Sequence, residues 1–443
     1  MSNIVIIGNG ISGITAARHI RKLSAHAITV ISAESEHFFS RTALMYVYMG
    51  HMKWEHLKPY EDFFWKKNRI NLIFNKVEQV LPTENKLKLS NGEEMLYDTL
   101  ILATGSKPAF YNWSGQDALG VQGLYSKQDL ETMEQNTKDI NRGVIVGGGL
   151  IGIEVAEMLR SRNIDVTFLV RESAFWNNVI PMEEAKMIGR HIREHHVDLK
   201  LQTELKEVLK DDNNRVKSVV TNTGEEVPCE FVAITTGVTP SIDFLKNSGI
   251  ETNRGVLVDE YLKTNFENIY AIGDCAEIKS SQPGRRAIEQ VWYTGRMMGE
   301  TVAINICKKP VAYNPGIWFN SAKFFDIEYQ TYGNVPAVLS EEIDSFYWED
   351  SERKLAFRVV YNKQGKEVIG MHSFGIRLRH PVCDKWIRSK TTVNEVMRNI
   401  YDAHFDPEFY KTYYTELVNK YNTEKGENVS LNNWSIKRML GMA

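Results

Sequence analysis

Two groups of closely spaced glycines have the pattern of loops that hold the phosphates of a nucleotide. The first is Gly8, Gly10 and Gly13, and the second is Gly147, Gly149 and Gly152. In such a loop the first glycine permits a tight turn, the second lets a pyrophosphate approach the backbone, and the third lets a helix pack closely on a strand. The N–H groups at the start of the following helix then face the phosphates. Each group therefore predicts a dinucleotide site.

The segments around each glycine group predict the elements that this chemistry needs. Residues 4–7 form an apolar, β-branched run typical of a buried strand, and residues 14–23 predict a helix. A second strand is expected at 28–31, followed by Glu34, about 20 residues after Gly13, where a carboxylate can accept hydrogen bonds from ribose hydroxyls. The same order recurs as a strand at 143–146, a helix at 153–160 and a strand at 166–170. The chain is thus expected to be α/β, with two Rossmann-like domains.

The composition narrows the class of protein. The chain has 443 residues, which predicts roughly three domains, and 43% hydrophobic and 25% charged residues, as in ordinary globular proteins. A net charge of −3 gives no sign of nucleic-acid binding. The four cysteines lie far apart without a Cys-x-x-Cys pair, which argues against a disulfide framework or a closely spaced redox dithiol. No apolar run reaches the roughly 18 residues that span a bilayer, and the first strand leaves no room for a signal peptide. We expect a cytoplasmic protein.

Two dinucleotide sites in one chain favour hydride transfer between two cofactors. A nicotinamide donates a hydride, and a flavin accepts it and releases electrons singly or in pairs. Because this chemistry depends mainly on the positions of two rings, no side-chain acid or base is required, and no catalytic residue is predicted.

Further segments resemble the flavoproteins with two dinucleotide-binding domains, the pyridine nucleotide-disulfide oxidoreductase superfamily. Residues 99–106 resemble the strand and Ala-Thr-Gly turn that leave the FAD domain, 231–240 resemble the exit from the NAD domain, and 264–274 resemble the second FAD fingerprint. The resemblance covers roughly residues 1 to 315. It implies that the first unit binds FAD and the second binds NAD(P)H.

The motifs and the resemblance together give two sets of expected cofactor contacts. The FAD set is Gly8, Gly10, Ile11, Ser12, Gly13, Glu34, Arg41, Ala103, Thr104, Gly105, Gly273, Asp274, Glu289 and Gln290. The NAD(P) set is Gly147, Gly149, Leu150, Ile151, Gly152, Glu154, Arg171, Glu172, Thr236 and Gly237.

The resemblance also implies roles for several of these residues. Asp274 would bind the ribityl chain, although its Gly-Asp setting also fits a helix N-cap. Glu289 and Gln290 precede a helix whose N-terminus would face the flavin's pyrimidine ring, or they are a plain helix start. Arg41 would reach the FAD pyrophosphate. Glu154 would lie near the nicotinamide amide, and its alternative is an exposed acid favoured by the helix dipole.

The preference for NADH or NADPH depends on two adjacent residues. Glu172 could bind the adenosine ribose hydroxyls, whereas Arg171 could pair with a 2′-phosphate. Because Gly152 occupies the third glycine position, where NADP enzymes often carry alanine, NADH is favoured.

The electron acceptor is predicted from the branch that the chain resembles. Residues 38–50 lack the cysteine of the disulfide reductases. Within them, residues 39–50 resemble the FAD/NADH module of nitrite reductases, and rubredoxin and ferredoxin reductases carry related patterns. Met45 and Tyr46 stand where the ferredoxin reductases carry a lysine. We expect a small redox protein as acceptor. The alternatives are a quinone reductase at a membrane surface, suggested by the short basic segment 434–440, and a slow-turnover flavin-bound sensor or scaffold.

We expect four segments in the domain organisation. Residues 1–114 and 246–315 form the FAD domain, 115–245 the NAD(P) domain, and 316–443 a C-terminal α+β domain, β-rich with a helical extension, through which two chains could form a homodimer. His191 and His195 have a spacing that could hold a metal, but their charged neighbours favour a solvated helix face, and no metal is predicted.

Overall fold

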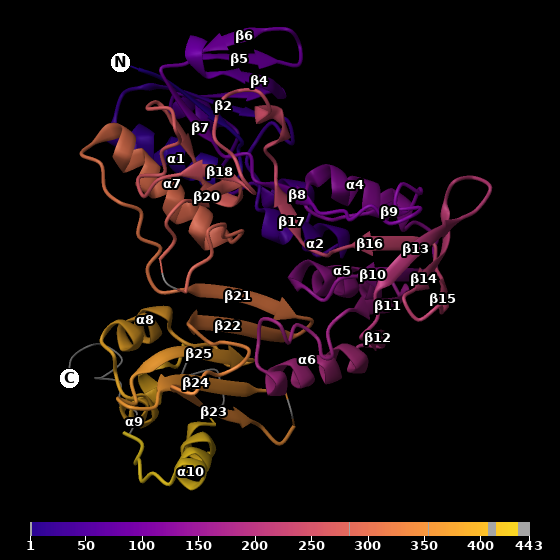
Figure 1. The fold of residues 1–443 in the computed structure, drawn as a ribbon, viewed down its shortest axis with the longest axis vertical. Helices are drawn as coiled ribbons and strands as arrows, with labels where there is room; N and C mark the ends of the chain where they lie inside the picture. Colours follow the sequence, from indigo (N-terminus) through magenta and orange to yellow (C-terminus); the bar gives the residue numbers. More distant parts are fainter. Residues whose placement is uncertain (1, 283, 353, 406–412, 433–443) are drawn as a thin grey trace. The chain divides into compact units, whose positions relative to one another are not determined.

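The computed structural model describes residues 2–282, 284–352, 354–405 and 413–432. The chain divides into two compact units (Figure 1). The first unit contains residues 1–166 and 204–315, and the second contains residues 167–203 and 316–443. The predicted division into four segments stays a prediction.

A parallel sheet forms the centre of the first unit. Its strands have the order β19-β7-β1-β2-β3 and are β1 (Asn3–Ile7), β2 (Ala27–Ser32), β3 (Ile70–Phe74), β7 (Thr99–Leu102) and β19 (Ile269–Ala271). The β-branched residues of β1 are buried because neighbours flank this strand on both sides and helices cover the sheet.

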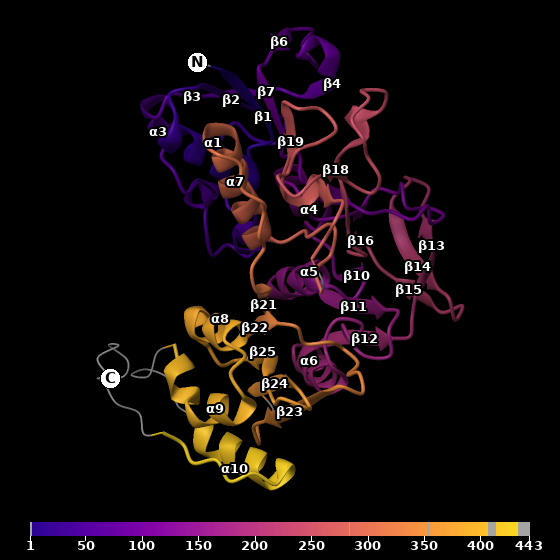
Figure 2. The ribbon, with the colours of Figure 1, turned by 60° about the vertical axis from the view of Figure 1, so that its left-hand side comes forward.

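Helices α1 (Ile11–Leu23) and α7 (Trp292–Cys307) lie side by side in this unit (Figures 1 and 2). They approach closely because α7 presents glycines to α1. A Cβ atom at Gly295 would lie 2.5 Å from Ser12 Oγ, and one at Gly299 would lie 2.6 Å from the Ser12 carbonyl oxygen. Larger side chains at these two positions would force the helices apart.

A second strand–loop–helix motif lies in the same compact unit. Strands β10 (Arg142–Val146), β16 (Phe231–Ile234) and β9 (Val121–Gln122) pair in parallel, and α5 (Leu150–Ser161) follows β10. Strand β11 (Asp165–Val170) carries the chain across the boundary between the compact units. The two predicted Rossmann-like units are therefore confirmed.

Smaller elements complete the first unit. Two antiparallel three-stranded sheets contain β4 (Val77–Leu81), β5 (Lys86–Leu89) and β6 (Glu94–Leu96), and β13 (Leu205–Lys210), β14 (Val216–Thr221) and β15 (Glu226–Pro228). The pairs are β8 (Ser106–Pro108) with β17 (Val238–Pro240), and β18 (Val256–Val258) with β20 (Ala276–Ile278). The short helices are α2 (Leu44–Tyr48), α3 (Phe63–Lys67) and α4 (Lys127–Asn136), and 3₁₀ turns cover Arg41–Ala43, Trp54–Leu57, Pro82–Glu84, Asp243–Leu245 and Gly273–Cys275.

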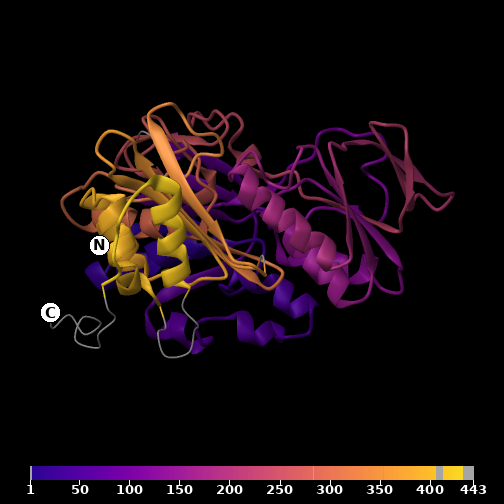
Figure 3. The ribbon, with the colours of Figure 1, turned by 90° about the horizontal axis from the view of Figure 1, so that it is seen from below.

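The second unit is built on an antiparallel sheet of order β21-β22-β25-β24-β23. Its strands are β21 (Phe319–Phe324), β22 (Ile327–Gly333), β23 (Ile343–Glu349), β24 (Ala356–Asn362) and β25 (Val368–Phe374). Helices α8 (His380–Arg388), α9 (Val393–Arg398) and α10 (Tyr414–Lys425), with a 3₁₀ turn at Ile400–Ala403, share one hydrophobic core with the sheet, and Figure 3 shows these helices in yellow over the orange strands. The predicted C-terminal α+β domain is confirmed.

Helix α6 (Met182–Glu194), which is followed by β12 (Val197–Leu201), joins this sheet through buried charges. Glu184 is fully buried and accepts hydrogen bonds from Arg358 Nε at 2.8 Å and His372 Nδ1 at 2.9 Å. Because alternate side chains of a strand point to opposite faces, Arg358 lies on the face opposite to Phe357 and Val359, which pack in the core with α8–α10. The sheet is therefore covered on both faces.

Several expectations about local structure need correction. In α3 the side chain of Phe63 is 66% exposed, whereas that of Trp65 is 3% exposed. Strand β23 was not predicted. His191 is 4% exposed, so its helix face is not solvated. The basic segment 434–440 lies outside the described residues. Across the part of the chain that the structure describes, no helix has the length and apolar character needed to cross a bilayer.

Candidate functional site

The first glycine loop combines two tightly packed glycines with one open position. Gly8 has a φ of 110°, and a Cβ atom there would lie 2.1 Å from the Ala103 carbonyl oxygen; one at Gly13 would lie 2.0 Å from the Gly8 carbonyl oxygen. A Cβ atom at Gly10 would meet nothing within 4 Å. Because Gly10 is also the N-cap of α1 and no side chain caps this helix, the open space adjoins the N–H groups that a helix leaves for an anion.

Ser12 and Ile11 lie in the first turn of α1, and Ser12 fills the space between this helix and its neighbours. A Cβ atom at Gly273 would lie 2.3 Å from Ser12 Oγ. The start of α1 is thereby packed against the 3₁₀ turn that carries Asp274. Residues from both FAD fingerprints, the glycine loop and the segment ending at Asp274, come together in space.

Asp274 has a partner that the sequence did not indicate. The Tyr125 hydroxyl donates a hydrogen bond to Asp274 Oδ2 at 3.1 Å and accepts one from the Ser106 backbone N–H at 3.0 Å. Burial raises the pKa of Tyr125 far above its usual value, so the hydroxyl keeps its proton. Burial also raises the pKa of Asp274, although the bonds from Tyr125 and Ser106 and the charge of Arg41 oppose this rise. No local sequence pattern marks Tyr125, because the contact joins residues 149 positions apart.

Glu34 and Arg41, both expected to contact FAD, bind each other. Arg41 Nη1 donates to Glu34 Oε1 at 2.7 Å, the second guanidinium nitrogen binds the other carboxylate oxygen, and the Lys127 backbone N–H adds a bond of 3.0 Å. Arg41 also lies over the Tyr125 ring at 4.5 Å. Since a carboxylate offers about four acceptor positions, these three bonds leave Glu34 room for roughly one more donor.

The turn that leaves β7 is tied to the segment before α7. Gln290 Nε2 donates to Ser106 Oγ at 2.9 Å, and Thr104 Oγ1 donates to the Ser241 carbonyl oxygen at 2.8 Å. Ala103, Thr104 and Gly105 thus line the same region as Gly8 and Gln290.

Glu289 has partners that the sequence did not indicate. Both of its oxygens accept bonds from Arg285 at 2.5 Å, and Thr294 Oγ1 donates to it at 3.1 Å. Glu289 is 7% exposed, so this buried acid is neutralised by Arg285 next to the start of α7.

The second glycine loop repeats the design of the first. Gly147 has a φ of 111°, and a Cβ atom there would lie 2.8 Å from the Thr235 backbone, whereas one at Gly149 would lie no closer than 3.9 Å to a neighbour. Gly149 is the N-cap of α5, and Leu150, Ile151 and Gly152 form its first turn. The exit of β16, at Thr236 and Gly237, thus takes the place that Ala103 and Thr104 take at the first glycine loop.

Glu154 lies in α5, one turn after Gly149. Burial raises its pKa from 4.5 to about 7, and the nearby charge of Glu157 adds to the rise. A carboxyl group that holds its proton near neutral pH can donate as well as accept a hydrogen bond.

Arg171 and Glu172, the residues expected to choose between NADH and NADPH, bind each other. Arg171 Nη2 lies 3.0 Å from Glu172 Oε1, and their side chains are 69% and 18% exposed. Both residues follow β11 in the second compact unit. The pairing does not decide the cofactor, and the preference for NADH stays a prediction.

Cysteine chemistry has no support at this site. All four cysteines are free. Cys275, next to Asp274, is fully buried and its thiol lies 3.5 Å from the Leu102 carbonyl oxygen. Burial raises the pKa of Cys275, and a protonated thiol is a poor nucleophile.

Comparison with known proteins places this geometry in a family. Residues 2–299 match the model of the pyridine nucleotide-disulphide oxidoreductases. The chain is 25% identical to nitrite reductase [NAD(P)H] of Bacillus subtilis over 84% of its own length, but spans only 45% of that protein. It is 30% identical to rubredoxin-NAD(+) reductase of Acinetobacter baylyi, covering 63% of this chain and 74% of the relative. An NAD-dependent persulfide reductase from A. fulgidus shares the fold, with a TM-score of 0.83, 22% identity, and coverage of 98% of this chain and 86% of that one. The chain therefore belongs to the pyridine nucleotide-disulphide oxidoreductase family, as its motifs implied.

Proposed function

We propose that the chain is an FAD-dependent NAD(P)H oxidoreductase that passes electrons to a small redox protein of the rubredoxin or ferredoxin type. The observation that carries the proposal is the repeated glycine loop, with open space at Gly10 and at Gly149 beside a helix N-terminus. The relatives named rubredoxin-NAD(+) reductase and nitrite reductase [NAD(P)H] support the choice of cofactors, and the former supports the acceptor.

The residues around the first glycine loop fit FAD. When bound, FAD accepts a hydride from a nicotinamide and releases electrons singly or in pairs. Gly10 admits the pyrophosphate, and the helix dipole of α1 favours its charge. Glu34 has room for a ribose hydroxyl. Asp274, held by the protonated Tyr125, presents a carboxylate to the ribityl hydroxyls.

The second glycine loop would bind the nicotinamide cofactor. Gly149 and the start of α5 would receive its pyrophosphate. We further propose NADH, because Glu172 is the less exposed of the two selector residues and can accept bonds from ribose hydroxyls. No side chain is assigned to proton transfer.

Two matched glycine variants separate binding of a cofactor from folding. Gly10 has φ −68° and ψ −177°, and Gly149 has φ −111° and ψ −177°, which any residue adopts. Alanine at either position should fold normally while its methyl group blocks a pyrophosphate. We expect Gly10→Ala to lose FAD at least about tenfold more readily, or about 1.4 kcal/mol. Gly149→Ala should stay yellow and be reduced slowly by NADH.

The measurement is anaerobic stopped-flow reduction of the purified protein by NADH and NADPH, followed by re-oxidation with rubredoxin, ferredoxin, a quinone or oxygen. Reduction by NADH and rapid re-oxidation by a redox protein are expected. A colourless protein that takes up no FAD would refute the cofactor assignment. Faster re-oxidation by the quinone would favour the membrane alternative, and reduction slower than about once per minute would favour the sensor. Homodimer formation through the C-terminal domain stays a prediction.

A further inference from the structure

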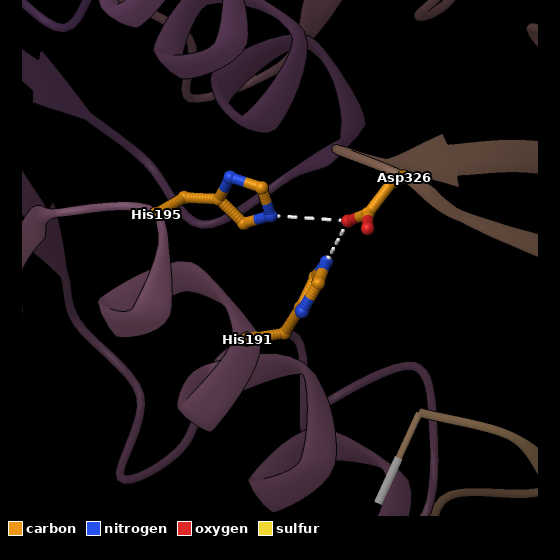
Figure 4. A group of neighbouring side chains, drawn as sticks. All are labelled: His191, His195 and Asp326. Carbon is orange, nitrogen blue, oxygen red and sulfur yellow. Dashed lines mark hydrogen bonds and ion pairs between the residues drawn. The ribbon is translucent and has the colours of Figure 1, made fainter. Parts of the chain in front are cut away.

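Three side chains that could hold a metal ion lie in the second compact unit, and none of them belongs to the candidate cofactor sites. His191 lies in α6, His195 directly follows this helix, and Asp326 lies in the turn between β21 and β22. Asp326 Oδ1 is 2.5 Å from His191 Nε2 and 3.0 Å from His195 Nε2. Figure 4 shows both imidazole rings directed at the same carboxylate. One ligand atom from each residue fits within a distance of 4.8 Å.

The surrounding packing fixes the two rings. His191 is 4% exposed, and its ring centroid lies 4.6 Å from that of His195. The His195 ring stacks on Phe325, with centroids 4.2 Å apart and planes 3° apart. Phe325 has a φ of 54°, which a bulky side chain rarely adopts. The turn thus places an aromatic ring under His195 and a carboxylate between the two histidines.

The charges around His191 favour a cation at this point. Its Nδ1 atom lies 3.6 Å from Glu194 Oε2, while Nε2 faces Asp326. A neutral imidazole carries a proton on one nitrogen only and so can donate to one of these two carboxylates. A metal ion bound to Nε2 would leave Nδ1–H free to donate to Glu194, which is the usual carboxylate–histidine–metal arrangement.

The two arginines that neighbour His191 in α6 have other partners. Arg190 pairs with Glu349, and Arg193 donates to the carbonyl oxygens of Gly189 and Leu199. The cluster therefore offers two imidazoles and a carboxylate, and these interactions of the two arginines do not involve that carboxylate.

We propose that His191, His195 and Asp326 bind a divalent transition metal ion of the zinc class. Ligand atoms around tetrahedral zinc lie roughly 3.3 Å apart, given metal–ligand distances of about 2.0–2.2 Å. Asp326 and the two histidines therefore need to move only slightly apart to admit the ion. Two nitrogens and one oxygen suit Zn²⁺ better than Mg²⁺, which prefers oxygen ligands. The fourth position is left to water, because Asp326 and His195 reach solvent at 63% and 36% exposure of their side chains. The ion would join α6 to the β21–β22 hairpin.

The test is calorimetric titration of the full-length, FAD-loaded protein with Zn²⁺, after treatment with a chelator and exchange into a non-coordinating buffer. We expect one Zn²⁺ per chain and binding at least about tenfold weaker in His195→Gln and in Asp326→Asn. Both altered side chains reach solvent, so these variants should fold. His196→Asn is the matched control: His196 is an exposed neighbour with a φ of 60°, which asparagine tolerates, and its affinity should change less than about twofold.

A second readout is the melting temperature, which Zn²⁺ should raise in the wild type and in His196→Asn but not in the other two variants. Excess Mg²⁺ should not displace Zn²⁺. The proposal is overturned if the wild type takes up no Zn²⁺. It is also overturned if His195→Gln and Asp326→Asn bind Zn²⁺ as tightly as the wild type, since binding would then lie outside this cluster, or if Mg²⁺ competes equally, since Mg²⁺ prefers oxygen ligands.

Discussion

The variant Glu154→Gln should be more stable than the wild type, and this difference in stability should be larger at pH 8 than at pH 5. Burial and the charge of Glu157 raise the pKa of Glu154 from 4.5 to about 7. The folded wild type therefore keeps a proton that the unfolded chain releases between these two values. Glutamine has a similar shape and no charge, so Glu154→Gln removes the cost of ionising this group inside the fold.

The size and sign of the effect follow from linkage between protonation and folding. The separation between the unfolded and folded pKa values, 4.5 and about 7, corresponds to roughly 3 kcal/mol. Below pH 4.5 Glu154 is protonated in both the folded and the unfolded wild type, so it does not lower the stability. As the pH rises from 4.5 to 7, the wild type loses stability progressively, and above pH 7 the loss is complete. Glu154 is only partly buried as a whole residue, and contact with solvent reduces the effect. We therefore expect the stability of the variant relative to the wild type to increase by about 2 kcal/mol between pH 5 and pH 8.

Thermal unfolding across this pH range measures the effect. An unfolding entropy of about 2.1 cal/mol/K per residue over the whole chain makes 2 kcal/mol equivalent to about 2 °C. The difference in melting temperature between Glu154→Gln and wild type should grow by that amount from pH 5 to pH 8. Glu93→Gln, at an exposed position, is the control and should show no such growth. A difference that stays flat with pH, or that shrinks, would refute the argument from burial.

Two further predictions concern the cofactors and the packing of α1. Glu34→Ala should weaken FAD retention, measured as flavin absorbance after gel filtration, whereas Glu172→Ala should keep the colour and raise the concentration of NADH needed for reduction; unchanged flavin content in Glu34→Ala would disprove the ribose assignment. Gly299→Ala should cost about 1–3 kcal/mol in thermal unfolding, because the new methyl group would lie 2.6 Å from a backbone oxygen of Ser12. Gly189→Ala, with its nearest neighbour at 3.7 Å in the interior of α6, should instead stabilise the protein by about 0.5–1 kcal/mol, and a loss in this variant or none in Gly299→Ala would contradict the packing argument.

Local order along the chain was enough to predict both strand–loop–helix units. The apolar run before Gly8 and the glycine spacing after it correspond to β1 and α1, and the same holds for β10 and α5. These elements were predictable because each depends on neighbours within about twenty residues. The orientation of α3 was not, since the choice between Phe63 and Trp65 as the buried side chain depends on which face meets the sheet.

Contacts between distant segments explain what the sequence did not reveal. Tyr125 acquires its role only when the fold brings it to Asp274, 149 positions further along the chain. The cluster at His191 is a similar case. Charged neighbours in sequence suggested a solvated helix face, but the hairpin that carries Asp326 lies against this face and supplies a third ligand.

The two glycine loops show why a motif alone does not prove that a cofactor binds. Gly8 and Gly147 are required by packing, because each faces the backbone of a strand exit, at Ala103 and at Thr235. Any protein with this fold needs glycine there, whether or not it binds a dinucleotide. Gly10 and Gly149 have no neighbour that demands glycine, and their backbone angles suit other residues. Their small size is useful only if a ligand approaches the helix N-terminus, so these two positions, rather than the complete motif, carry the evidence for two cofactors.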